Sequence, residues 1–124
     1  MGTVLKVEVT LLTPFPEFGI RMWKWSGLAL NDVGDDLVIP YRADRSFHFY
    51  GVLGGASLRV EGSNELSAPT NYSLLKDIFG VDASVIAGPW IVTIGQNVYR
   101  IRPAIVGGGG TTAITVVALI RGSL

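Results

Sequence analysis

The fold follows from one stretch of the chain, Ser46-Phe47-His48-Phe49-Tyr50-Gly51-Val52-Leu53-Gly54-Gly55-Ala56-Ser57-Leu58-Arg59-Val60-Glu61. On both sides of Gly54-Gly55, large apolar residues alternate with other residues, so that Phe47 and Phe49 share one face. Alternation with a period of two residues is typical of a half-buried strand. A Gly-Gly pair permits a tight reversal between two strands. We therefore predict two strands that are joined as a hairpin.

The same alternation recurs along most of the chain. Further strands are predicted at residues 3–12, 20–28, 37–40, 84–87, 90–94, 98–101 and 111–120. Turn signals rich in Gly, Pro, Asn and Asp separate them. No long helical pattern appears, and this spacing favours an all-β fold, an antiparallel sandwich of about eight strands. We predict a single domain over residues 1–124, with an N-terminal arm or loop formed by residues 1–25 or so.

The last predicted strand, residues 111–120, is apolar on both faces. Ile114 and Val116 lie on one face, and Val117 and Leu119 lie on the other. Such a strand is central in its sheet, covered on both sides, or part of an interface. The preceding Gly107–Gly110 run does not lead into a helix, as a phosphate-binding loop would, and we interpret it as a hairpin connection.

Charge and hydropathy narrow the classes of function. Ten basic and ten acidic residues cancel, and no basic patch of the kind that nucleic-acid binders use is evident. The chain is 48% hydrophobic with a mean hydropathy of +0.42. This composition indicates either a core rich in Val and Ile or apolar surface that a partner covers. The longest uncharged apolar stretch, residues 104–120, is broken by four glycines, so we expect neither a nucleic-acid nor a membrane partner.

The sequence offers no recognisable catalytic or metal-binding motif. It contains one histidine, His48, and no cysteine, which excludes a typical zinc site. No nucleophile motif accompanies His48, and we expect it to be a surface or interface residue. The acidic turn Asn31–Asp36 lacks the spacing of an EF-hand loop and is interpreted as a solvated turn. We therefore expect no catalytic residue, no cofactor and no metal, and predict that the chain is not an enzyme.

Large aromatic and apolar residues are the remaining candidates for a functional site. Trp and Tyr are frequent anchors of protein interfaces, although for any one aromatic side chain a place in the core is the commoner outcome. Trp23 and Trp25 share one strand face and can contact the same neighbour. The candidate interface residues are Phe15, Phe18, Trp23, Trp25, Tyr50, Trp90, Val117 and Leu119.

Two blocks of sequence resemble a known family. The block Asp44 to Asn64, DRSFHFYGVLGGASLRVEGSN, and the block Arg100 to Val116, RIRPAIVGGGGTTAITV, resemble runs of the tailed-phage capsid decoration (cement) proteins in order and spacing. Thr70-Asn71-Tyr72 between them resembles a further short element. Two departures stand out: Glu65-Leu66 replaces the usual Asp-Gly, and the residues before Asp44 match only through Trp25–Leu28 and the acidic turn that follows.

The resemblance implies a jelly-roll-like sandwich and a structural role in the virion. Proteins of this family sit as oligomers on the outer face of the phage head and hold neighbouring capsid subunits together. It implies the major capsid protein as partner, a homo-oligomer that is a trimer rather than a dimer, and assembly in the host cytoplasm. The alternative is a carbohydrate-binding module, because Gly62-Ser63-Asn64 followed by Tyr72 also resembles discoidin-like sugar-binding sandwiches.

Overall fold

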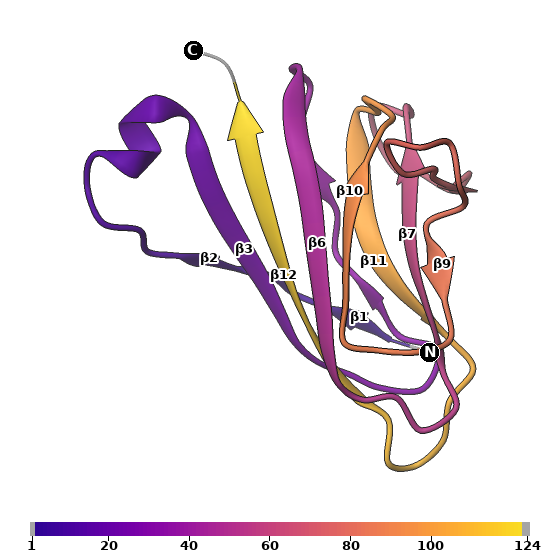
Figure 1. The fold of residues 1–124 in the computed structure, drawn as a ribbon. Coiled ribbons are helices and arrows are strands. Elements are labelled where there is room, and N and C mark those ends of the chain that lie inside the picture. The colour runs from indigo at the N-terminus through magenta and orange to yellow at the C-terminus, as the bar shows by residue number, and fades with distance from the viewer. Residues whose placement is uncertain (1, 123–124) are drawn as a thin grey trace.

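The computed structural model describes residues 2–122, apart from the side chains of Glu17 and Phe18. It is an all-β structure with one short 3-10 helix (Figure 1), which confirms the predicted fold class. The elements are β1 (Thr3–Val4), β2 (Val7–Val9), η1 (Phe15–Phe18), β3 (Ile20–Leu28), β4 (Val33–Gly34), β5 (Leu37–Val38), β6 (Ala43–Val52), β7 (Ser57–Ser63), β8 (Ser73–Leu74), β9 (Ser84–Val85), β10 (Trp90–Ile94), β11 (Arg100–Val106) and β12 (Ala113–Gly122). Among the described residues, no helix is long and apolar enough to cross a membrane.

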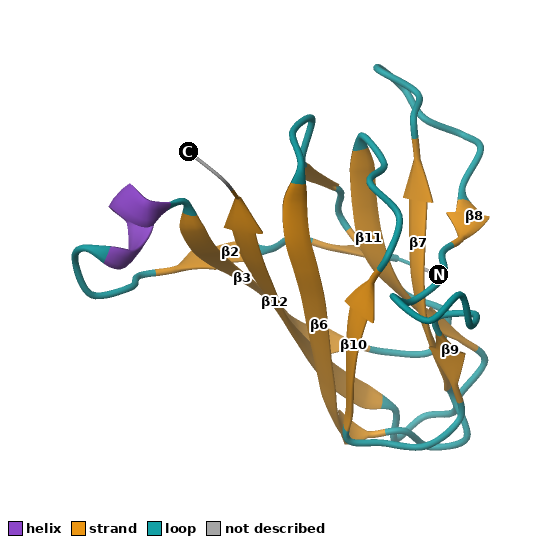
Figure 2. Ribbon diagram, turned by 45° about the horizontal axis from the view of Figure 1, so that its top comes forward, coloured by secondary structure: helices purple, strands orange, loops and turns teal. Residues whose placement is uncertain are grey.

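The strands form two sheets that face each other, as Figures 1 and 2 show. Sheet A has the order β1-β4-β11-β7-β8, with β5 also paired to β11 and β9 to β7. Sheet B has the order β10-β6-β12-β3-β2. Every strand pair is antiparallel except β1 with β4. The arrangement is sandwich-like. The predicted count of about eight strands is not confirmed, because the described residues form twelve.

The core lies between the inner faces of the two sheets. Phe47 and Phe49 of β6 are fully buried, and Trp25 stacks on Phe47 with ring centroids 6.0 Å apart. Alternate residues of the central strands complete the core: Ile114, Val116, Ala118 and Ile120 from sheet B, and Leu58, Val60, Ile101 and Ile105 from sheet A. Each large side chain buried in this way contributes about 1.5–3 kcal/mol through the hydrophobic effect.

Both glycine-rich connections join strands of different sheets, so the two predicted hairpins are wrong. Gly54-Gly55 leads from β6 in sheet B to β7 in sheet A, and Gly107–Gly110 leads from β11 in sheet A to β12 in sheet B. The two turns contact each other through Thr112, whose hydroxyl donates to the Leu53 carbonyl at 2.8 Å. A Cβ atom on Gly54 would lie 2.6 Å from the Thr112 oxygen, so this position requires glycine.

Strand β12 is central in sheet B, as the first of the three expected arrangements requires. It pairs with β6 on one side and β3 on the other. Ile114 and Val116 face the core, whereas Val117 and Leu119 lie on the opposite face and are half-buried. Sheet A covers only one side of β12.

The N-terminal part of sheet B projects beyond sheet A. Figure 1 shows β2, η1 and the adjoining end of β3 on the side of the molecule away from sheet A. Leu12 and Phe15, in and beside η1, are 81% and 47% exposed. We call residues 7–22 the projecting arm; it falls within the predicted N-terminal segment.

The buried position of Phe47 predicts a large effect on stability. Phe47→Ala removes a fully buried ring and leaves a cavity between the sheets, and we expect it to lower the free energy of unfolding by about 3–5 kcal/mol. The matched control is Phe15→Ala on the exposed η1, which we expect to change stability by no more than about 0.5 kcal/mol. Urea denaturation measures both, and equal effects of the two variants would contradict the described core.

Candidate interaction surface

The outer face of sheet B presents two rows of side chains across all five strands. Directly opposite residues in an antiparallel pair lie on the same face. Val117 lies between Lys24 of β3 and His48 of β6, and this row ends in Val7 on β2 and Ile91 on β10. The next row runs through Val9, Met22, Leu119, Ser46 and Thr93. The strand register therefore assembles one surface from residues that are far apart in the sequence.

This outer face is mainly apolar and accessible. Val117, Leu119 and Met22 are half-buried at its centre, and at its edges Val9 is half-buried whereas Val7 and Ile91 are 69% and 65% exposed. Tyr50 extends it, because its ring lies 5.0 Å from that of His48. Charge on this face is sparse, which is typical of the centre of a protein–protein interface.

The structure brings together only some of the predicted interface residues. Tyr50, Val117 and Leu119 lie on the outer face of sheet B. Phe15 lies apart from them on the projecting arm, and the side chain of Phe18 lies outside the described residues.

The three tryptophans lie toward the core rather than on the outer face. Trp25 is 0% exposed, so the structure places it in the core and not on a surface. Trp23 shares the inner face with Trp25 but is half-buried, and the Lys6 Nζ lies 5.6 Å from its ring centroid. Trp90 packs on Phe49 with ring centroids 5.3 Å apart. Trp23 and Trp25 do share one strand face, but it is the face that sheet A covers.

Several exposed apolar residues are absent from the sequence-based set. They are Leu5, Val7, Leu12, Val52, Leu66, Ile78, Phe79, Val81, Ile86 and Ile91, each more than half exposed. The single half-buried strand predicted over residues 3–12 places Leu5 and Val7 on one apolar face. In the structure, Val7 is exposed because its register with Lys24 places it on the open outer face of sheet B, and Leu5 lies between β1 and β2. Alternation identifies an apolar face without identifying what covers it.

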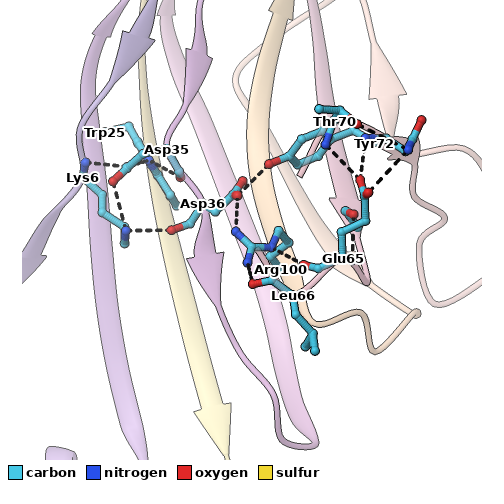
Figure 3. Close-up of polar contacts among 11 residues, drawn as sticks. Lys6, Trp25, Asp35, Asp36, Glu65, Leu66, Thr70, Tyr72 and Arg100 are labelled. Atoms are coloured by element: carbon cyan, nitrogen blue, oxygen red, sulfur yellow. Dashed lines mark hydrogen bonds and ion pairs between the residues drawn. The ribbon is translucent and has the colours of Figure 1, made fainter. Parts of the chain in front are cut away.

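On the other side of the molecule, a polar network holds the N-terminal residues and the turn before β5 in place (Figure 3). Asp35 accepts hydrogen bonds from the Trp25 Nε1 at 2.9 Å and from the backbone N–H of Lys6 at 2.8 Å. The Lys6 Nζ donates to the second Asp35 oxygen at 3.1 Å and to the Asp36 carbonyl at 2.7 Å. The indole of the buried Trp25 thus connects the core to a half-buried ion pair.

Asp36 continues the network toward the 64–72 loop. Its carboxylate accepts hydrogen bonds from Arg100 at 2.8 Å and from the Tyr72 hydroxyl at 2.6 Å. Arg100 also donates to the carbonyls of Glu65 and Leu66 at 2.8 and 2.6 Å, as Figure 3 shows. The expectation of a solvated acidic turn is therefore wrong: its carboxylates are half-buried and bonded within the protein, because other strands bring donors to them.

The network shifts the pKa values of Tyr72 and Glu65. Burial, with the hydrogen bond to Asp36 as second cause, raises the pKa of Tyr72 to about 12. The Arg102 guanidinium lies over the Tyr72 ring, 3.5 Å from its centroid. Glu65 accepts backbone hydrogen bonds from Asn71 at 2.7 Å and Thr70 at 2.9 Å, and these hydrogen bonds hold the pKa of its carboxyl below the usual value. Glu65 thus joins the two ends of the 65–71 segment through these hydrogen bonds.

An open groove of about 530 Å³ lies beside this loop. Its polar lining residues are Ser63, Asn64, Glu65, Asn71, Ser73 and Gln96. The Asn64 oxygen accepts from the Tyr99 N–H and the Gln96 oxygen from the Lys76 N–H, which leaves both side-chain NH₂ groups as donors. The groove can therefore offer amide donors and a carboxylate to a polar ligand.

In residues 2–122, no group of three or more His, Asp or Glu side chains could hold a metal ion. His48 lies on the outer face of sheet B beside Tyr50 and opposite Val117. The expected surface position of His48 is therefore confirmed.

The raised pKa of Tyr72 predicts a dependence of stability on alkaline pH. The folded state favours the neutral phenol, so this contribution is fully present below pH 10.0, the usual pKa, and is lost as the pH rises through about 12. Titration by tyrosinate absorbance should show one tyrosine ionising near pH 12 in the wild type, and Tyr72→Phe should remove that step. If the step persists in Tyr72→Phe, the assignment fails.

No family model, curated protein or solved structure matches this chain.

Proposed function

We propose that the chain is a structural virion protein that binds the outer surface of a phage major capsid protein lattice and joins adjacent capsomers. The observation that supports this most strongly is the outer face of sheet B. A mainly apolar surface centred on Val117 and Leu119 extends over five strands, and sheet A leaves it open. The central strand β12 pairs with β3 on one side and β6 on the other, so this surface stands on a hydrogen-bonded sheet, and a preorganised surface loses little conformational entropy on binding.

The two blocks that resemble the decoration proteins also support the proposal, because their strands pair with one another. The first block comprises nearly all of β6 and all of β7, and the second comprises β11 and the first part of β12, up to Val116. These strands pair with one another in both sheets: β6 with β12 in sheet B and β7 with β11 in sheet A. The resemblance therefore covers the scaffold of both sheets, and we propose that the sandwich is of the jelly-roll-like kind.

The proposed role requires a large buried interface and several linked copies of the chain rather than a catalytic site. A specific interface buries on the order of 1,000 Å² or more in total. Several copies held together increase the effective affinity for a lattice that repeats the same site. We propose a homo-oligomer, a trimer rather than a dimer, that is made in the host cytoplasm and added to the outside of the head.

The outer face gives a direct test of capsid binding. Val117→Glu places a carboxylate opposite Lys24 in the register, where a cross-strand pair of opposite charge is tolerated. Burying that carboxylate against a capsid should weaken binding about tenfold or more. Co-sedimentation with expanded capsids of a phage that encodes this chain measures the change.

The matched control for capsid binding is Ile86→Glu. Ile86 is 83% exposed and lies between β9 and β10, away from the outer-face rows, and we expect this variant to bind as the wild type does. Thermal melts monitored by circular dichroism establish that both variants fold. Wild-type affinity of a folded Val117→Glu variant would contradict the assigned surface, and no co-sedimentation of the wild type would contradict the function.

Self-association is a separate expectation. The exposed Leu5, Val7 and Leu12 of the N-terminal segment are apolar surface that a second copy can bury. Sedimentation velocity over a range of concentrations should reveal a species larger than the 13.3 kDa chain. A strictly monomeric species at the highest concentration would contradict the oligomer.

The polar groove beside the 64–72 loop favours a second candidate, carbohydrate binding. Its amides, hydroxyls and the Glu65 carboxylate are groups that hydrogen-bond sugars. A glycan array separates the two proposals, because a capsid cement protein is expected to show no selective signal. A selective signal that Asn71→Ala abolishes would establish the second candidate.

A further inference from the structure

Arg45 is a buried cation at the end of the sandwich. It lies on the inner face of β6, in line with Phe47 and Phe49, and is 1% exposed. Its Nη1 donates to the Val98 carbonyl at 2.7 Å, and its Nη2 donates to the carbonyls of Ile39 and Tyr41 at 3.2 and 3.1 Å. The guanidinium thus joins the segment before β6 to the segment before β11.

Every partner of Arg45 in residues 2–122 is neutral. None of the ion pairs of the described residues includes it, and its Nε has no hydrogen-bond partner there. The neighbouring Asp44 lies on the other face of β6, opposite Arg121 in the register. Burial lowers the pKa of Arg45. A buried charge without a counter-charge is unfavourable, and a buried polar atom without a partner adds to that cost.

An open pocket of about 320 Å³ lies against this cation. Arg45 forms part of its wall, together with Tyr41, Arg42, Asn97 and Tyr99, and no residue that lines it is acidic. Arg42 is exposed and brings a second positive charge to the same pocket. The Asn97 amide and the two tyrosine hydroxyls are further groups able to donate hydrogen bonds. The volume is within the range of small-ligand sites.

We propose that this open pocket binds a carboxylate, with Arg42 as its ion-pair partner and Arg45 as the buried positive charge that attracts it. Guanidinium groups favour carboxylates through charge-assisted hydrogen bonds. A single carboxylate supplies the counter-charge that the described residues do not give Arg45. The site is at the end of the sandwich, apart from the rows of the outer face, and does not depend on the proposed function.

The experiment is an NMR titration of the isolated, ¹⁵N-labelled chain with sodium acetate at constant ionic strength. We expect saturable shifts of the amides of Ile39, Tyr41, Arg42 and residues 97–99, and no such shifts with sodium chloride. Arg42→Gln removes the ion-pair partner of the carboxylate and should weaken acetate binding about tenfold. Arg21→Gln, which removes an exposed arginine from the projecting arm, should bind acetate as the wild type does.

A second titration identifies the source of the carboxylate. N-acetyl-glutamate amide that binds more tightly than acetate supports a protein side chain as the natural ligand, and equal or weaker binding supports a small free carboxylate. No saturable shift with either compound overturns the proposal. Identical shifts with chloride, stronger binding of inorganic phosphate, or unchanged acetate binding by Arg42→Gln also overturn it.

Discussion

The burial of one apolar face of sheet B against sheet A is the interaction on which the rest of the structure depends. Phe47 and Phe49 of β6 and the alternate residues of β12 cannot be covered by their own sheet, because strands of one sheet lie side by side. Strands β7 and β11 cover them, and the two glycine-rich turns bring the chain across at the same end of the molecule. The contact between these turns through Thr112 ties both crossings together.

Sheet B extends further than the surface that covers it. Sheet A covers the inner face of sheet B, and the outer face is open. At one side, β2 and η1 project beyond the part of sheet B that faces sheet A (Figure 2). A sheet that is apolar on both sides and covered on one has apolar surface available for a partner. The proposed cement function uses this surface, whereas the two resembling blocks mainly account for the scaffold behind it.

Charged groups are few, and the structure uses them in two different ways. The network of Lys6, Asp35, Asp36 and Arg100 pairs each charge with an opposite one and with hydrogen-bond donors or acceptors, and so fixes the N-terminal residues and the 64–72 loop. Arg45 has only neutral acceptors and lies beside an open pocket without acidic residues. The first arrangement is complete within the chain, whereas the second lacks a counter-charge, and this difference points to a ligand at Arg45.

The sequence by itself determined the all-β class, most of the longer strands, and the apolar character of both faces of β12, because these properties depend on local alternation and turn residues. It also named Val117, Leu119 and Tyr50 as candidate interface residues, and these three lie on the outer face of sheet B. Only the tertiary structure decided that Gly54-Gly55 and Gly107–Gly110 cross between sheets, that Trp25 is core, and that Asp36 meets Arg100 and Tyr72. The physical reason is that a period of two residues defines two faces without labelling either. Which face is buried, and which strands become neighbours, depends on pairing between residues that are distant in the chain.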